Sequence, residues 1–517
     1  MLRIQGVVRS WAIDMSMSPF DFPTRVEDAS VRQRALKLLG GRRVCLPTFA
    51  ELAMPRTAPE AIRSALAEIG PDDPHPHNLY RVNWFNDLQR RGQVPVPVHV
   101  ELPEALTGVK TRIVVALGAL FPMIGAHKVL AAYACLAPRL VSGRFDPTQQ
   151  RAVWPSTGNY CRGGVAISRV LGCRAVAVLP AGMSQERFDW LARWVTEPRD
   201  IVRTPGTESN VKEIYDRCAE LQRDPANEIV NQFSEFGNYL GHWRCTGPAL
   251  GQIFETLARK SRGLQLAGFV CASGSAGTLA AGDYLKEKHG AKIAVLEAAE
   301  CPTLLMNGYG EHNIQGIGDK HVPLIHNVTN TDVVIGVSDQ ATDGLNAVFN
   351  TDAGRAYLAR RLGLAENLLG TLKWFGLSSI ANILGAIKFA KHYGLGPDSV
   401  VVTVATDGAD LYASEVRRYL ERRHNSGEVY AEMAAELVGA HLAAADTENV
   451  LDATHRERER IFNLGYFTWV EQQGITLADF VRRKNQGFWR GLQDLVPQWD
   501  EMITAFNCDT GMHAAHA

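Results

Sequence analysis

Short apolar runs and longer amphipathic stretches alternate along most of the chain. Buried strands are predicted at 111–120, 175–179, 268–272, 292–297 and 400–405, and helices at 185–194, 211–222, 247–260, 278–289 and 378–392. Strands separated by helices of this length are typical of right-handed βαβ crossovers and of a mainly parallel sheet. The pattern therefore predicts a doubly wound α/β fold, in which ligands bind beyond the carboxyl ends of the strands.

Both terminal segments differ from this central pattern. Residues 1–78 are mixed in character and end in a cluster of proline, glycine and aspartate, GPDDPHPHN. Residues 421–517 are polar and are predicted to form helices, with a tryptophan-rich stretch at 488–499. We therefore expect an N-terminal extension (1–78), a central α/β unit (79–420) and a C-terminal helical module (421–517).

Charge and cysteine content exclude several classes of function. The chain has 54 basic and 55 acidic side chains without a basic cluster, so we expect neither a nucleic-acid partner nor binding to an anionic membrane surface. Its nine cysteines are scattered without a C-x-x-C pair, which argues against a disulfide framework and a metal site. No apolar segment is continuous enough for a signal sequence or a membrane span. A soluble, cytoplasmic protein is expected.

One lysine and one histidine, Lys128 and His127, interrupt the apolar run at 116–132. We expect a helix to begin just after Pro122 and to carry both side chains. Burying an ammonium group without a partner is unfavourable, so such a lysine either reaches solvent as a structural residue or is engaged in chemistry. His127 alone is as compatible with a core histidine as with a ligand contact.

A glycine-rich turn, CASGSAGT at 271–278, lies between a predicted strand and a predicted helix. Such a turn can bind a phosphate through its backbone amides, here with the hydroxyls of Ser275 and Thr278 as further donors. It lacks the lysine of a Walker loop and the spacing of a dinucleotide fingerprint, which disfavours ATP and NAD. A plain helix-capping turn is the alternative interpretation.

A second turn, PSTGNYCRGG at 155–164, gathers Ser156, Thr157 and Asn159 at the start of another predicted helix. These donors could bind a carboxylate, although an ordinary helix cap would use the same residue types. A lysine able to form a Schiff base, a carboxylate loop and a phosphate loop are together what pyridoxal phosphate chemistry requires.

Several stretches of the central unit occur in an order and spacing that is specific to one family. They are PSTGNYCRGGVAISRVLGCRAVAVLP, VRTPGTESNVKEI, VNQFSEFGN, SGSAGT and HNIQGIGDKHVP. In these stretches residues 79–414 resemble the cysteine synthase (O-acetylserine sulfhydrylase) and cystathionine β-synthase-like branch of fold-type II pyridoxal phosphate enzymes. The resemblance implies a tryptophan synthase β-like fold of two doubly wound, mostly parallel sheets, with 79–420 as a catalytic unit of two interleaved α/β lobes. It also implies pyridoxal 5′-phosphate as cofactor and a homodimer.

The resemblance assigns roles to individual residues. Lys128 would form the internal aldimine, and Asn159 would hydrogen-bond the phenolic oxygen of the cofactor. The cofactor phosphate would be held by Gly274, Ser275, Ala276, Gly277 and Thr278, and the substrate carboxylate by Ser156, Thr157, Tyr160 and Gln232.

Two departures from the family pattern concern the cofactor. The tetrapeptide GAHK at 125–128 is that of the tryptophan synthase β subunit, in which the histidine helps to bind phosphate, so His127 is expected to do so here. Where the family commonly has a serine beside the pyridine nitrogen, the run is ATDGADLYAS, with Gly408 at the most direct match. We expect Thr406 to make this contact, with Asp407 as second choice. A neutral hydroxyl favours β-elimination, whereas a carboxylate would strengthen the electron sink.

Tyr160 and Arg162 replace residues that are small in cysteine synthases, which would narrow or recharge the substrate pocket. Arg162 would either recognise a second acidic group of the substrate or lie on the surface.

The activity implied is β-replacement on a serine- or cysteine-type amino acid through an aminoacrylate intermediate. Two alternatives stay open. One is a β-elimination lyase, a desulfhydrase or dehydratase that releases a keto acid and ammonia. The other is a non-catalytic regulatory or binding homologue. The sequence therefore predicts a transferase or lyase that acts on a small amino acid, and it identifies neither the donor nor the nucleophile.

Overall fold

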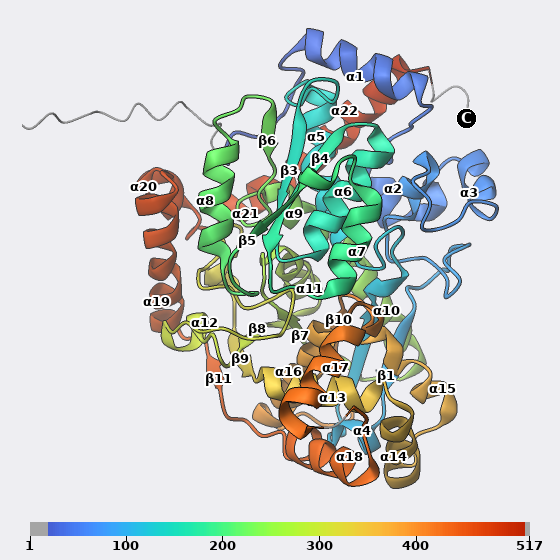
Figure 1. The fold of residues 1–517 in the computed structure, drawn as a ribbon, viewed down its shortest axis with the longest axis vertical. Coiled ribbons are helices and arrows are strands. Elements are labelled where there is room, and N and C mark those ends of the chain that lie inside the picture. The colour runs from blue at the N-terminus through green and yellow to red at the C-terminus, as the bar shows by residue number, and fades with distance from the viewer. Residues whose placement is uncertain (1–18, 426, 512–517) are drawn as a thin grey trace, which may run out of the picture.

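Two sheets organise the chain, and the computed structural model describes residues 19–425 and 427–511 (Figure 1). The larger sheet has seven strands, in the spatial order β1 (His99–Leu102), β2 (Arg112–Leu117), β10 (Ser399–Ala405), β7 (Gln265–Ala272), β8 (Lys292–Ala298), β9 (Val333–Val337) and β11 (Val450–Asp452). The smaller sheet has the order β5 (Ile201–Thr204), β4 (Arg174–Pro180), β3 (Arg151–Pro155) and β6 (Asn227–Ile229). Within the described ranges, only the edge strands β1 and β11 pair antiparallel with their neighbours. The predicted pair of mostly parallel sheets is confirmed.

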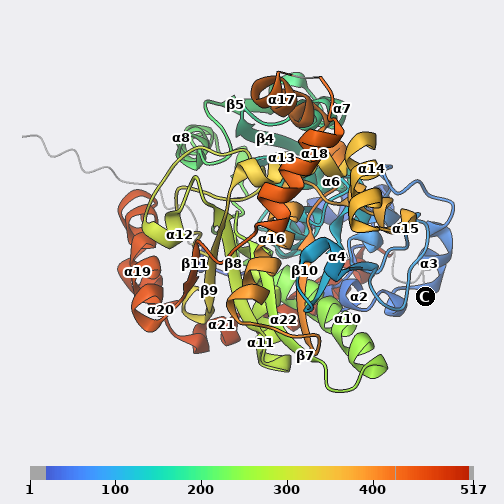
Figure 2. The same cartoon turned by 90° about the horizontal axis from the view of Figure 1, so that it is seen from below.

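The larger sheet is buried on both faces. Successive residues of β2 alternate between two hydrophobic clusters, with Val114 in one and Val115 in the other, because side chains of a strand point alternately to opposite faces. One cluster includes α16 (Leu377–His392), seen in Figure 2 in front of the sheet, and the other includes α10 (Gly247–Lys260) and α11 (Ala280–His289). Burial on both faces explains why these strands are continuously apolar in sequence.

The other helices surround these layers. They are α1 (Ala29–Gly41), α2 (Phe49–Ala53), α3 (Glu60–Leu66), α4 (Glu104–Thr107), α5 (Lys128–Ser142), α6 (Asn159–Leu171), α7 (Gln185–Trp194), α8 (Val211–Leu221), α9 (Phe236–Gly241), α12 (Thr303–Met306), α13 (Asp339–Phe349), α14 (Asp352–Leu362), α15 (Glu366–Leu369), α17 (Ala413–His424), α18 (Ala431–Val438), α19 (His455–Tyr466), α20 (Leu477–Arg482), α21 (Gln486–Gln493) and α22 (Leu495–Asp509). None of the helices in the described ranges has the length and apolar character needed to cross a membrane.

Both terminal segments pack on the central unit and on each other. Helix α22 contacts α5 and α2, and the Trp499 indole donates a hydrogen bond of 2.8 Å to the backbone carbonyl of Pro23. The Asp500 carboxylate accepts the first amide of α2, from Phe49, at 2.6 Å. Figure 1 shows α1 and α22 together at one end of the molecule, while β11 joins the larger sheet. The described parts of both terminal segments share one hydrophobic core with the central unit. The boundaries at 78 and 421 therefore stay a prediction from the sequence.

The helix that carries Lys128 begins later than predicted. The sequence predicts its start just after Pro122, whereas α5 begins at Lys128 itself. The preceding residues are attached to the end of β10, because Ala126 forms a β-bridge with Asp407 and the His127 amide donates to the Thr406 carbonyl at 3.3 Å. This tertiary pairing replaces the first predicted turns and places the lysine at the helix N-terminus.

Candidate active site

The candidate site lies where strands of the two sheets end. The chain leaves β7 into the loop 273–278, leaves β10 into Thr406 and Asp407, and leaves β3 of the smaller sheet into the loop 156–158. Helix α5 packs against α6 of the smaller sheet, so Lys128 at its N-terminus faces both halves. This is the position at which a doubly wound fold binds ligands.

The amine of Lys128 reaches the glycine loop. Its Nζ donates a hydrogen bond of 2.9 Å to the hydroxyl of Ser275 and one of 3.4 Å to Oε1 of Gln232. Burial lowers the pKa of Lys128 to about 8, although the carboxyl groups of Asp319 and Glu208 act in the opposite direction. Part of the amine is therefore neutral near neutral pH, as a nucleophile or a base requires.

The loop 274–278 has the properties of a phosphate cradle. Among the described residues, the amides of Gly274, Ser275 and Ala276 donate to no protein acceptor. The Ser275 hydroxyl accepts a hydrogen bond of 2.9 Å from Nδ2 of Asn238, and a Cβ at Gly277 would overlap that same asparagine. Free amides before a helix suit an anion, and the close packing requires glycine at this point.

His127 borders the same cradle. Its Nε2 lies 3.1 Å from the hydroxyl of Thr278, and its ring stacks on Trp84 and meets His242 edge-on. Burial lowers the pKa of His127 to about 3, so the ring is neutral at physiological pH and acts as a hydrogen-bonding group. The residues present therefore fit the phosphate of pyridoxal phosphate.

The loop after β3 contributes some of its predicted groups and not others. The Ser156 hydroxyl accepts the Gly158 amide at 2.9 Å, and Gly158 has a φ of 148°, where a Cβ would overlap the side chain of Arg187. The Gln232 amide lies beside this loop, donating to the Pro155 carbonyl at 3.4 Å. Tyr160 turns away, since its ring packs edge-on against Trp154 inside the core. Tyr160 therefore neither narrows the pocket nor offers its hydroxyl to it.

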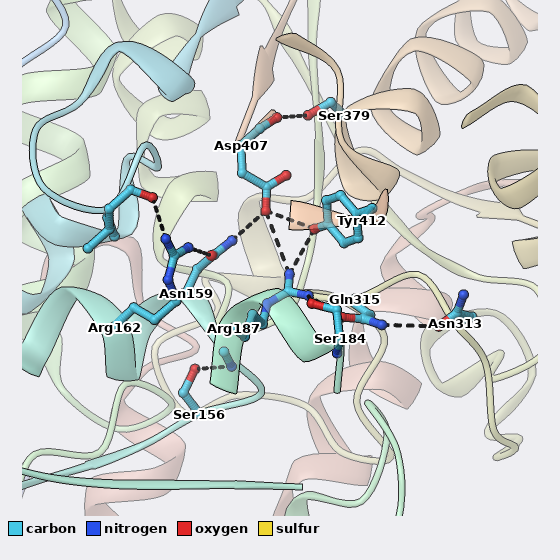
Figure 3. Close-up of polar contacts among 12 residues, drawn as sticks. Ser156, Asn159, Arg162, Ser184, Arg187, Asn313, Gln315, Ser379, Asp407 and Tyr412 are labelled. Carbon is cyan, nitrogen blue, oxygen red and sulfur yellow. Dashed lines mark hydrogen bonds and ion pairs between the residues drawn. The ribbon is translucent and has the colours of Figure 1, made fainter. Parts of the chain in front are cut away.

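Figure 3 shows a set of buried polar side chains behind this loop, which we call the arginine network: Asn159, Arg162, Arg187, Asp407 and Tyr412. Oδ2 of Asp407 accepts hydrogen bonds from Asn159 at 2.6 Å and from Tyr412 at 2.8 Å, and lies 3.7 Å from the Arg187 guanidinium. Arg187 donates to the Tyr412 hydroxyl at 2.8 Å and also to Gln315. Every member is bonded to another member.

Arg162 does not lie on the surface. Its guanidinium donates to Oδ1 of Asn159 and to the backbone carbonyl of Ile124, each at 2.9 Å, and stacks on the ring of Trp190. Burial and the neighbouring Arg187 lower the pKa of Arg162 to about 10, so the group remains charged. The surface interpretation of Arg162 is wrong, and its contacts turn it toward Asn159.

The loop after β10 offers two candidates for the pyridine nitrogen. The carboxylate of Asp407 is engaged with the arginine network, while the half-buried hydroxyl of Thr406 has no protein partner among the described residues. Oδ1 of Asp407 also has no partner within the described ranges, so the choice of Thr406 over Asp407 stays a prediction.

Two buried carboxyl groups, Glu208 and Asp319, lie close enough for their charges to act on Lys128, and we call them the carboxyl pair. Both oxygens of Glu208 and Oδ2 of Asp319 are buried without a hydrogen-bond partner in the part of the chain that the structure describes. Burial raises the pKa of each to about 8, the nearby Thr157 hydroxyl lowering that of Glu208 somewhat. No group of three or more metal-binding side chains is found in the described parts of the chain.

Several residues of the candidate site were not predicted from the sequence. Asn238 and Asp319 fall inside stretches that carry the family resemblance, so closer attention to those stretches could have found them. Arg187 offers no such signal, because in sequence it is one polar residue of an amphipathic helix.

Comparison with known proteins places this geometry in a family. Residues 89–407 match the family model described as pyridoxal-phosphate dependent enzyme. A probable cysteine synthase of Bacillus subtilis is 30% identical over 292 residues, which are 56% of this chain and 85% of that protein. A cysteine synthase of Staphylococcus aureus is 31% identical over 56% of this chain and 84% of its own length. A hydrogen sulfide-producing enzyme of Fusobacterium nucleatum superposes with a TM-score of 0.51 at 21% identity, over 64% of this chain and 98% of that one, and shows the same fold. The chain belongs to the family of pyridoxal-phosphate dependent enzymes, and pyridoxal 5′-phosphate is its cofactor.

Proposed function

We propose that the protein catalyses β-replacement on a serine- or cysteine-type amino acid, with pyridoxal phosphate bound at Lys128. The observation that carries the proposal is the position of Lys128 Nζ, 2.9 Å from a glycine loop whose amides are free for a phosphate among the described residues. The cysteine synthases among the curated relatives support the reaction class.

In this proposal, separate groups of residues bind the cofactor, bind the substrate and transfer the proton. The loop 274–278, with His127, holds the cofactor phosphate, and Thr406 takes the pyridine nitrogen. Ser156, Thr157, Gln232 and the backbone amide of Tyr160 bind the substrate carboxylate. Bound pyridoxal phosphate supplies an electron sink for the substrate α-carbon. The Lys128 amine, with its lowered pKa, takes the α-proton and keeps it on Nζ for return.

Elimination is the second candidate reaction, because two groups that could exclude water do not do so. Tyr160 lies in the core, and the turn 306–310 exposes Met306 and Tyr309, which are 66% and 81% exposed. A site open to water would let a keto acid and ammonia form in place of the replacement product.

A homodimer in the cytoplasm belongs to this proposal as well, and it is supported by the family resemblance. Size-exclusion chromatography with light scattering measures the assembly directly.

The deciding experiment follows the absorption spectrum of the holoenzyme during additions of L-serine, O-acetyl-L-serine, O-phospho-L-serine, L-cysteine and L-threonine. A spectral change that persists until a thiol is added establishes replacement and identifies the donor. Rapid release of pyruvate or 2-oxobutyrate establishes elimination.

Lys128→Ala should abolish both the cofactor's yellow colour and turnover. Lys388→Ala is the matched control, because Lys388 is also buried but pairs with Asp446 away from the site. If no donor changes the spectrum and the two variants behave alike, the proposed function is wrong and a non-catalytic role gains support.

A further inference from the structure

Two residues at which this chain departs from its family come together at one side chain. By the family resemblance, Arg162 stands at a position expected to hold a small residue, and Asp407 lies in the run ATDGADLYAS, in which a serine is expected. They are far apart in sequence, yet both hydrogen-bond Asn159, from opposite sides (Figure 3). Asn159 is the residue expected at the phenolic oxygen of the cofactor.

The contacts distinguish the two ends of the Asn159 amide. Oδ1 accepts a hydrogen bond of 2.9 Å from the Arg162 guanidinium, and Nδ2 donates one of 2.6 Å to the Asp407 carboxylate. A flipped amide would place NH2 against a cation and the carbonyl against an anion. Both charge-assisted hydrogen bonds would be lost inside the core, where such losses are costly.

Each flanking group is itself fixed. Arg162 is held by the Ile124 carbonyl and the Trp190 ring, and Asp407 by the Tyr412 hydroxyl and Arg187. An amide Nδ2 has two hydrogens, and only one of them is bonded within the described residues.

We propose that Arg162 and Asp407 are positioning residues that lock the Asn159 amide in one orientation, so that its second Nδ2 hydrogen is presented to the phenolic oxygen of bound pyridoxal phosphate. This inference rests on the proposed function only for the place of the cofactor. Neither Arg162 nor Asp407 touches the cofactor, and both act through Asn159.

Charge adds to the effect of orientation. Two guanidinium groups, of Arg162 and Arg187, surround the single carboxylate of Asp407, which leaves one positive charge in excess. Three other groups act on these guanidinium groups: the exposed Asp410, the Cys161 thiol and Glu208. Burial raises the pKa of Cys161 to about 12 and that of Glu208 to about 8. Both are therefore largely neutral near neutral pH. The two guanidinium groups favour an ionised phenolic oxygen, and the exposed Asp410 offsets them only in part because solvent screens its charge.

The test is the absorption spectrum of the holoenzyme, titrated from about pH 6 to about pH 10. The wild-type band should not change over this range. In Arg162→Met the band should shift at the acidic end, because loss of the cation and of the amide orientation lets the phenolic oxygen become protonated. In both Arg162→Met and Asp407→Asn the cofactor should bind about tenfold more weakly, because the Asn159 amide is no longer held from one side. Asp407→Asn has nearly the shape of the original residue and carries the test if Arg162→Met does not fold.

Arg169→Met is the matched control on the same helix. Arg169 also stacks on a tryptophan, Trp194, and donates to backbone carbonyls, but it does not contact Asn159. Its spectrum should follow the wild type. The double variant Arg162→Met/Asp407→Asn should bind cofactor no more weakly than the weaker single variant, because both act through one amide.

The inference would be overturned if the spectrum of Arg162→Met titrated like those of wild type and Arg169→Met. It would also be overturned if the double variant lost cofactor affinity by the product of the two single-variant losses. A protein that shows the expected shifts without turning over any amino acid would contradict only the proposed reaction. A wild-type protein that takes up no pyridoxal phosphate would overturn both.

Discussion

Two groups of buried polar side chains near Lys128 differ in how far their hydrogen bonds are satisfied. In the arginine network each side chain is bonded to another member, although Oδ1 of Asp407 and the Nε atoms of Arg162 and Arg187 are buried without a partner in the described ranges. In the carboxyl pair the oxygens of Glu208 and Oδ2 of Asp319 are buried, yet they have no partner within residues 19–425 and 427–511. Burial of a polar group is tolerated when its hydrogen bonds are satisfied and is costly when they are not.

The difference indicates different tasks. A network whose members bond one another is rigid and can hold Asn159 and the loop at Gly158 in place before any ligand arrives. Unsatisfied carboxyl groups make the empty protein less stable, and they are the groups that a bound molecule can stabilise. The contrast between the two regions can be tested by removing one member at a time.

The largest effect is expected from Arg187→Met, which removes the cation that faces Asp407 in the arginine network. Breaking a buried ion pair leaves an uncompensated charge, so the free energy of unfolding should fall by about 3–5 kcal/mol. Urea denaturation of the protein without cofactor measures the loss. Arg217→Met, in an exposed pair with Glu220, is the control and should cost less than about 0.5 kcal/mol. Equal losses in the two variants would show that the network contributes nothing special.

Glu208→Gln should increase the free energy of unfolding at alkaline pH, whereas Arg187→Met should decrease it. The carboxyl binds its proton more tightly in the folded state, with a pKa near 8 compared with 4.5 when unfolded, so stability falls as the pH rises through this window. A tenfold difference in proton affinity corresponds to about 1.4 kcal/mol, which makes the full effect on the order of 5 kcal/mol, slightly less between about pH 5 and about pH 9. Unfolding of wild type and variant without cofactor, at about pH 5 and about pH 9, measures it.

In that experiment the variant should lose less stability than the wild type between the two pH values. A parallel loss in both proteins would mean that Glu208 has a partner in solution and that the comparison between the two regions is wrong.

What the sequence predicts well here depends on local pattern. An isolated lysine in an apolar run and a glycine turn between strand and helix are visible in short stretches of chain, so Lys128 and the loop at 274–278 can be predicted as candidates, and the structure brings them together. The strands were found for the same reason, since burial on both faces makes them continuously apolar.

The arginine network and the carboxyl pair depend on contacts between distant segments. Arg187 and Asp407 are separated by more than two hundred residues, and no periodicity shows that their side chains meet in the core. The start of α5 was misplaced for the same reason, because Ala126 pairs with Asp407 rather than continuing the helix. Such pairings follow from the assembled fold and not from the pattern of either segment alone.

Tyr412→Phe tests the network with a smaller change. The hydroxyl accepts from Arg187 and donates to Asp407, so its removal leaves these two groups 3.7 Å apart without a bridge. The free energy of unfolding should fall by about 1–2 kcal/mol, less than for Arg187→Met. Tyr357→Phe, at a partly buried tyrosine outside the network, is the control for loss of a hydroxyl. A loss no greater than in this control would mean that Arg187 and Asp407 hold together unaided.

The smallest effect is expected for Asp319→Asn, and it concerns reactivity rather than stability. Once ionised, Asp319 stabilises the ammonium form of Lys128, so its removal should lower the pKa of Lys128 below about 8. The neutral fraction of the amine should rise by up to about threefold at about pH 8, where Asp319 carries charge. The rate at which the protein without cofactor captures pyridoxal phosphate, measured from about pH 6 to about pH 10, reports this fraction. Because Asp319 and Lys128 influence each other, the wild-type profile belongs to the pair, and the variant should show a single titration. Asp410→Asn, on the side of the arginine network, should leave the profile unchanged. If Asp319→Asn also leaves it unchanged, Asp319 does not act on the lysine and the carboxyl pair serves the substrate alone.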